Sequence, residues 1–178
     1  MKHSRLFLFL TFISFVGLST FLNAQFIGKQ SDWKGFKKTV FKVGEYEAFV
    51  VQPKEPAKDK PWVWRARFPT YHTEIDEMLL RDGYHVAHVN AGRRLGSPNA
   101  LKIWKQFYNL LTNKHGFNKK VVLEGVSRGG LYVYRWAKAY PETVACMYND
   151  TPVCDFKSWP GGKGVGKGAQ GEWKRVIE

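Results

Sequence analysis

One segment of the chain has residue types and spacing suited to nucleophilic chemistry, Gly125-Val126-Ser127-Arg128-Gly129. It has the form G-x-S-x-G, in which a sharp turn between a strand and a helix presents a serine hydroxyl. The apolar run Val121-Val122-Leu123 precedes it, and a helical pattern begins near Arg128. Glycine two residues before and two residues after the serine leaves room where a β-carbon would clash. We therefore predict that Ser127 is a nucleophile; an ordinary tight turn is the alternative.

A serine nucleophile needs a base, because its hydroxyl is hardly ionised at neutral pH. The five histidines all precede Ser127 in the sequence: His3, His72, His85, His88 and His115. We expect the last three to be structural or surface residues, whereas His72 is a candidate for substrate contact. Asp150 is a candidate for the acid of a catalytic triad, with a loop or helix-cap aspartate as the alternative. No histidine stands where a triad base would be expected, after the serine.

Other chemistries have weaker support in the sequence. No set of histidines and cysteines has the spacing of metal ligands, so we expect neither a metal centre nor another cofactor. For Cys146 and Cys154 two interpretations stay open, a disulfide and free cysteines, with Cys146 buried in a strand. Trp159 is a candidate to stack on a sugar ring, and packing in the core is the alternative.

A glycine-rich segment follows Trp159. Gly161, Gly166 and Lys167 match part of the phosphate-binding pattern G-x-x-x-x-G-K, but Gly168 stands where that pattern has serine or threonine. No predicted strand ends directly before it. We therefore interpret this segment as a loop rather than as a nucleotide site.

Strands and helices alternate along the chain around these residues. Two apolar-rich runs, 34–42 and 46–52, predict a hairpin. Further strands are expected at 62–68, 85–90, 121–124 and 144–148, and helices at 75–82, 98–115 and 128–140. This order predicts an α/β fold with a mostly parallel central sheet and helices on both faces.

Two helix starts are predicted from capping residues. Thr73 and Asp76 form a capping box for a helix whose apolar face is Ile75, Met78 and Leu79. Ser97-Pro98 begins a second helix. The apolar stripe of that helix is Ile103, Trp104, Phe107, Leu110 and Leu111.

The amino terminus has the pattern of an export signal. Residues 1–5 are basic, residues 6–22 are largely apolar, and Ala24 is small. We predict a signal peptide at 1–24, a mature domain at 25–178 and a secreted or periplasmic protein, with an uncleaved anchor as the alternative. The net charge is +13, but the basic residues are scattered. We therefore expect no nucleic-acid partner, and no stable membrane insertion after cleavage.

Three segments carry a resemblance to a known family, at 61–68, 123–130 and 152–162. Over about residues 34 to 158 the chain resembles the amino-terminal part of the α/β-hydrolases. It is most similar to exported bacterial members related to the prolyl-oligopeptidase and esterase groups. The resemblance implies that Ser127 forms an acyl-enzyme and that the backbone N–H of Arg128 holds the oxyanion. A second donor is implied in the loop after the third predicted strand, where Phe68 and Thr70 both qualify and Pro69 has no N–H.

The resemblance implies an esterase-like serine hydrolase that acts on a small-molecule or polysaccharide ester. Two alternatives stay open: a serine peptidase, and a secreted binding module on a hydrolase scaffold. The family places its triad acid and histidine after the serine, later in the chain. We therefore expect the fold to be incomplete at its carboxyl end and the 178 residues alone to be inactive.

Overall fold

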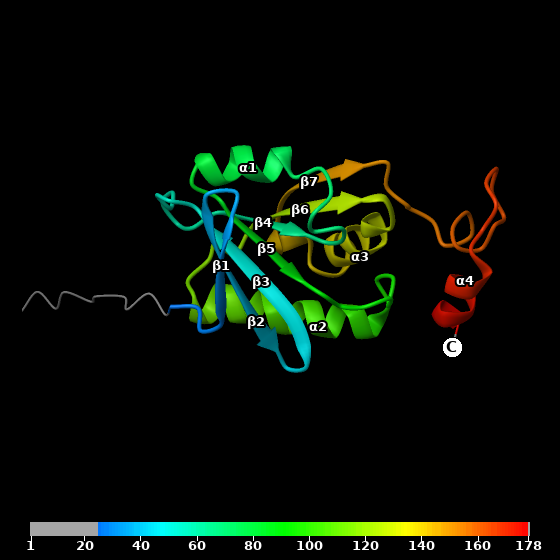
Figure 1. Ribbon diagram of the computed structural model, residues 1–178. Helices are drawn as coiled ribbons and strands as arrows, with labels where there is room; N and C mark the ends of the chain where they lie inside the picture. Colours follow the sequence, from blue (N-terminus) through cyan, green and yellow to red (C-terminus); the bar gives the residue numbers. More distant parts are fainter. Residues whose placement is uncertain (1–24, 178) are drawn as a thin grey trace, which may run out of the picture.

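The computed structural model describes residues 25–177, and the predicted signal peptide lies outside these residues. Seven strands form one sheet in the order β1-β2-β3-β5-β4-β6-β7 (Figure 1). The strands are β1 (Lys29–Trp33), β2 (Phe36–Val43), β3 (Tyr46–Gln52), β4 (Trp62–Arg65), β5 (His85–Val89), β6 (Val121–Val126) and β7 (Val144–Asp150). The helices are α1 (Glu74–Arg81), α2 (Pro98–Asn109), α3 (Gly130–Ala139) and α4 (Gln170–Ile177), with short turns η1 (Leu110–Lys114), η2 (Ser127–Gly129) and η3 (Pro141–Thr143).

The sheet has an antiparallel half and a parallel half. β1, β2, β3 and β5 pair antiparallel in that order. β5, β4, β6 and β7 pair parallel. The strand β6 leads into the turn at residues 125–130 that carries Ser127, which we call the elbow. The predicted α/β fold with helices on both faces is confirmed, and the sheet is mixed rather than mostly parallel, because three of its six strand pairings are antiparallel. The strand β1 was not predicted, because its sequence is polar and largely exposed and therefore lacks an apolar alternation.

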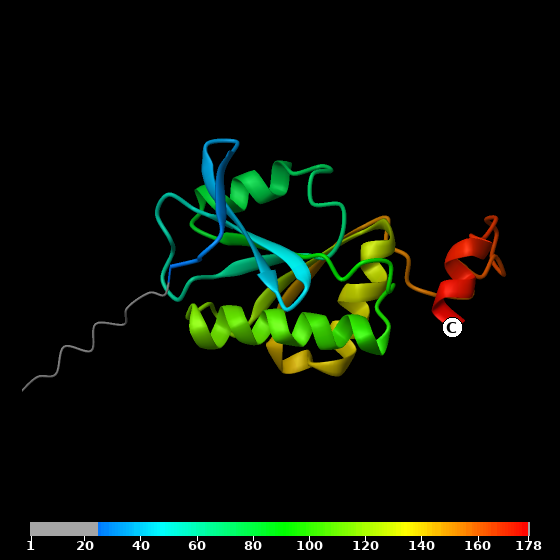
Figure 2. The ribbon, with the colours of Figure 1, turned by 60° about the horizontal axis from the view of Figure 1, so that its bottom comes forward.

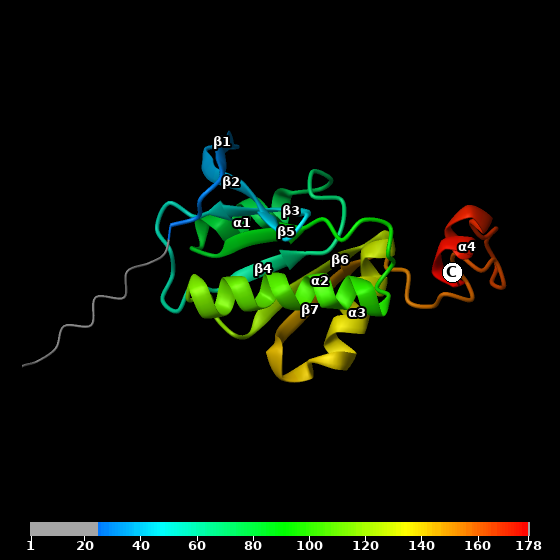
Figure 3. The same ribbon diagram turned by 90° about the horizontal axis from the view of Figure 1, so that it is seen from below.

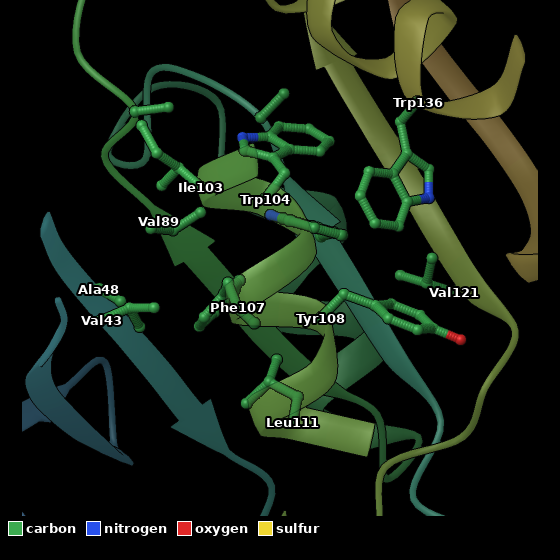
Figure 4. Packing of buried hydrophobic residues seen from close by; sticks show 14 of the residues in the cluster. Val43, Ala48, Val89, Ile103, Trp104, Phe107, Tyr108, Leu111, Val121 and Trp136 are labelled. Carbon is green, nitrogen blue, oxygen red and sulfur yellow. The ribbon is translucent and has the colours of Figure 1, made fainter. Parts of the chain in front are cut away.

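Helices cover both faces of the sheet, with α2 and α3 on one face and α1 on the other (Figure 3). Alternate residues of a strand point to opposite faces, so Trp64 faces α2 and α3 whereas Val63 faces α1. The Trp64 ring stacks on Trp104 at 4.1 Å between centroids and meets Trp136 edge-on at 4.9 Å. Figure 4 shows Trp104 and Trp136 from their two helices in this aromatic core.

Helix α2 agrees with the prediction. It runs along one face of the sheet (Figure 2) and begins at Pro98. The Ser97 hydroxyl accepts a hydrogen bond from the Ala100 N–H at 3.4 Å. The predicted stripe packs into the core as Ile103, Trp104, Phe107 and Leu111, with Leu110 partly buried at its edge.

Helix α1 differs from the prediction in its cap and its buried face. The Thr73 side chain makes no capping hydrogen bond. Asp76 does not reach back to the helix start, because its carboxylate turns into the protein and pairs with a buried arginine. The buried residues are Asp76 and Leu80, whereas Ile75 and Met78 are 37% and 60% exposed. The capping box was therefore wrong, and the predicted apolar face was wrong for Ile75 and Met78, whereas Leu79 packs against the core.

The strand β7 lies at one edge of the sheet, and most of its side chains are exposed. Cys146 lies in this strand and is exposed, so the prediction of a buried cysteine was wrong. The reason is the position of β7 at the edge of the sheet, where α3 contacts it less extensively than it contacts β6. Cys154 is also exposed, and both cysteines are free. Within residues 25–177, every helix is too short or too polar to cross a lipid bilayer.

Candidate active site

Ser127 occupies the turn that its motif predicts. The strand β6 ends at Val126, Ser127 begins the short turn η2, and α3 follows at Gly130. The φ angle of Ser127 is +50°, in the left-handed region that residues other than glycine rarely adopt. Such strain persists only where the surrounding structure enforces it, and it is common at functional sites.

Steric crowding explains why glycine occupies two positions of the elbow, Gly125 and Gly130, but it does not explain Gly129. A β-carbon on Gly125 would lie 2.4 Å from Asn149 Oδ1, and one on Gly130 would lie 2.6 Å from the Val153 carbonyl oxygen. A β-carbon on Gly129 would have its nearest neighbour at 3.4 Å, which is an ordinary contact. The predicted clash two residues after the serine was therefore wrong. The crowded position lies one residue later, where the segment after β7 packs on α3.

A cleft of about 500 Å³ opens beside Ser127. Its lining comes from the ends of three neighbouring parallel strands, β4, β6 and β7, as is usual for sites at the carboxyl edge of such a sheet. The lining residues are Phe68, Tyr71, Val126, Ser127, Asp150 and Thr151. The structure therefore brings the candidate acid Asp150 to the same cleft as the candidate nucleophile.

The loop after β4 forms one wall of this cleft. The strand ends at Arg65 rather than at the predicted residue 68, and the loop turns at Phe68, whose φ is +53°. Phe68 is half-buried and lines the cleft, whereas Thr70 is exposed in the same loop. The Arg128 guanidinium lies 5.3 Å from the centre of the Phe68 ring and 5.9 Å from that of Trp159. Trp159 is thus placed near the cleft through Arg128.

The described histidines lie outside this cleft. His72 is exposed, its Nδ1 lies 3.8 Å from a Glu74 carboxylate oxygen, and it lines a neighbouring cavity that also contains Asp150. His115 is buried and stacks on Phe26 at 3.8 Å between centroids. Among residues 25–177, no histidine therefore lines the cleft at Ser127.

His85 and His88 are buried in β5, and burial lowers the pKa of each to about 4. Both are therefore neutral near pH 7. His88 Nδ1 lies 2.8 Å from the Arg65 carbonyl oxygen, which can only accept, so this nitrogen carries the proton. The expected structural role of these two histidines agrees with this burial.

A buried charged cluster beneath the cleft was not foreseen. Arg65 is fully buried, and its guanidinium donates to Asp76 Oδ2 at 2.5 Å and to Glu124 Oε1 at 2.8 Å. Glu124 lies in β6, three residues before Ser127. In the sequence, Arg65 alternates with apolar residues, which is the pattern of a strand residue that faces solvent. Its partners Asp76 and Glu124 lie in other elements, later in the chain. No local signal in the sequence identifies the cluster.

The segment after β7 contacts the elbow before it reaches α4. The Val153 N–H donates to the Ser127 carbonyl oxygen at 2.8 Å. The glycine-rich segment is a loop, as predicted, and it leads to the helix α4, which was not predicted and lies apart from the sheet (Figure 1). In α4, Glu172 lies 3.8 Å from Arg93 and 3.9 Å from Arg128.

Comparison with solved structures identifies the architecture. An acetyl xylan esterase from Aspergillus awamori superimposes with a TM-score of 0.50 at 15% identity, over 62% of this chain and 50% of that one. A putative dipeptidyl aminopeptidase IV from Bacteroides ovatus gives a TM-score of 0.58 at 15% identity, over 83% and 24%. Lipase A from Candida antarctica gives 0.52 at 14% identity, over 80% and 43%. The chain has the α/β-hydrolase fold.

Within this α/β-hydrolase fold the chain spans half or less of the length of these structures. No family model matches the sequence, and no curated protein matches it either. The fold explains why Ser127, Asp150 and the loop after β4 meet at one edge of the sheet. In the part of the chain from 25 to 177, no group of three or more His, Cys, Asp or Glu side chains is arranged to hold a metal ion.

Proposed function

We propose that the protein is a serine hydrolase that cleaves an ester through an acyl-enzyme at Ser127. The observation that carries this proposal is the strained φ of +50° at Ser127, on a turn that opens onto the cleft. A turn without a chemical role would gain stability from glycine or asparagine at such a position. The similar folds of an acetyl xylan esterase and a lipase support an ester substrate, and the esterase supports a carbohydrate ester in particular.

In the proposed reaction, Ser127 Oγ attacks the acyl carbonyl, the alcohol leaves with a proton, and water then hydrolyses the acyl-enzyme. The N–H of Arg128 stabilises the oxyanion from the helix side of the elbow. We assign the second donor to Phe68 rather than Thr70, because Phe68 lines the cleft and Thr70 is exposed. Trp159 and His72 are retained as candidates for substrate contact at the rim.

The activity test compares the wild-type protein with Ser127→Ala, both as the gene product made in the source cell and as the 178-residue chain. A fluorophosphonate probe that labels the wild type and not Ser127→Ala supports the proposal. Absence of labelling in the native product refutes it and favours a binding module. We expect no ester turnover from the 178-residue chain, because its described histidines lie outside the cleft. Turnover that Ser127→Ala abolishes would refute that expectation.

A serine peptidase is the second candidate, favoured by the similar fold of the putative dipeptidyl aminopeptidase, which covers 83% of this chain. Paired substrates with the same acyl group separate the two: a p-nitrophenyl ester reports esterase activity and the matching p-nitroanilide reports amide cleavage. Acetylated xylan tests the carbohydrate-ester proposal. Export is tested by amino-terminal sequencing of the secreted or periplasmic protein, for which we propose cleavage after Ala24.

A further inference from the structure

The loop that forms one wall of the Ser127 cleft is held from beneath by a single side chain. Arg65 Nε donates to the Phe68 carbonyl oxygen at 3.1 Å. Its terminal nitrogens donate to the carbonyl oxygens of Tyr71 and His72, the latter at 3.4 Å. The planar guanidinium thus serves three carbonyl groups that point into the protein from one short loop.

The same guanidinium is anchored by two carboxyl groups from different elements. Asp76 belongs to α1 and Glu124 belongs to β6, and both side chains are almost completely buried. Arg65 therefore connects the loop to the helix that follows it and to the strand that leads into Ser127. We propose that Arg65, which is held by its contacts with the carboxyl groups of Asp76 and Glu124, is the positioning residue that fixes loop 68–72 beside Ser127.

One proton completes this cluster. A buried arginine with two ionised carboxylates would leave one uncompensated negative charge, which is costly in the interior. Asp76 Oδ1 and Glu124 Oε2 are both buried and have no donor when both groups are ionised. A proton on Glu124 lets that carboxyl donate to Asp76, and such a hydrogen bond lowers the pKa of Asp76 and raises the pKa of Glu124.

The charges around the cluster place this proton on Glu124. Burial, and then the negative charge of Asp76, raise the pKa of Glu124 to about 8. Burial also raises the pKa of Asp76, although Arg65 opposes that shift. The other charged or titratable groups that face the cluster are Lys34, near Asp76, and His72, Glu74, Tyr148 and Asp150 around the adjoining cavity.

Because the closed cluster holds a proton on Glu124, the order of loop 68–72 should depend on pH. When the cluster opens, Glu124 returns toward its ordinary pKa and releases the proton, so opening becomes more favourable as pH rises. Linkage gives a change of up to tenfold per pH unit between about 5 and 8, with a plateau above about 8, where the closed form has also lost the proton. The amide protection of residues 68–73 should follow this curve.

The test is hydrogen exchange of the full chain from pH 5 to 9, corrected for intrinsic exchange rates. We expect loop protection in the wild type to fall with pH up to about 8. Glu124→Gln keeps the shape of the neutral carboxyl and should remove this slope. Glu74→Gln, a matched substitution on the exposed side of the same cavity, should retain it. A wild-type slope that survives in Glu124→Gln, or a wild type with no slope, overturns the proposal.

Arg65→Lys tests the positioning role itself. A lysine has three donors on one nitrogen and cannot span the three loop carbonyls, so loop protection should fall about tenfold or more. The catalytic consequence rests on the proposed function. The maximal rate of Ser127 modification by a fluorophosphonate should fall at least ~10-fold, as for a displaced oxyanion donor, while the probe concentration at half-maximal rate changes less than about threefold.

Hydrogen exchange tests the role of Arg65, and fluorophosphonate labelling tests the proposed function, so the two proposals can fail separately. If the probe fails to label the wild type, the proposed function fails while the exchange arm still decides the role of Arg65. If Arg65→Lys folds and retains wild-type loop protection, the positioning role is refuted. If Arg65→Lys does not fold, the slope in Glu124→Gln decides.

Discussion

The two glycines of the G-x-S-x-G motif should respond differently to the same substitution. Gly125→Ala places a β-carbon 2.4 Å from Asn149 Oδ1 and 2.7 Å from Val133 Cγ2. Val133 is buried in α3, so either the helix or the elbow must shift. Overpacking of this kind costs ~1–3 kcal/mol. For a domain of this size each kcal/mol lowers the Tm by ~2–4 °C, so Gly125→Ala should lower the Tm by about 2–12 °C.

Gly129→Ala is the matched control. Gly129 has helical angles, φ −61° and ψ −28°, and its β-carbon would have its nearest contact at 3.4 Å. Alanine favours the helical conformation over glycine by up to ~1 kcal/mol, so this variant should match or exceed the wild type in stability. Urea unfolding followed by tryptophan fluorescence, together with thermal unfolding, measures both variants. If Gly129→Ala loses as much stability as Gly125→Ala, the steric reasoning is refuted.

Three further predictions concern the core, the pH dependence and the cysteines. Trp64→Ala should destabilise the protein by ~3–5 kcal/mol, because it empties a fully buried site. This would be contradicted if Trp64→Ala lowered the urea midpoint of unfolding by less than the same substitution at an exposed tryptophan does. His85 and His88 are held neutral with pKa about 4 against an ordinary 6.5, so they contribute stability above pH 6.5 that is lost as pH falls toward 4. Urea midpoints that stay constant over that range would argue against their burial. Cys146 and Cys154 should both react with a thiol reagent in the native protein without reductant, and a titre below two thiols would contradict their free, exposed state.

Much of the fold follows from local patterns in the sequence. The alternation of strand and helix, the hairpin at Gly44 and the capped start at Ser97 all depend on neighbours within a few residues. The elbow at Ser127 is likewise local, because its strand, turn and helix are consecutive. Such features are predictable because backbone preference and side-chain periodicity act over short distances.

The environment of the elbow depends on contacts between distant segments. Gly130 is crowded because the chain after β7 returns to pack on it, a contact that no motif spacing describes. Asp76 points into the protein instead of capping the helix, because it pairs there with Arg65 beside Glu124. Arg65 and Glu124 are fifty-nine residues apart in the chain. Cys146 is exposed because its strand lies at the edge of the described sheet.

The sequence by itself determined which residue could be the nucleophile and which turn would present it. Only the tertiary structure decided what surrounds that serine: the cleft shared with Asp150, the wall formed by Phe68, and the buried arginine beneath. The physical reason is that the burial of a charge is set by its partners. Arg65 is buried because two carboxyl groups and three carbonyl oxygens from separate segments compensate its charge in the folded chain.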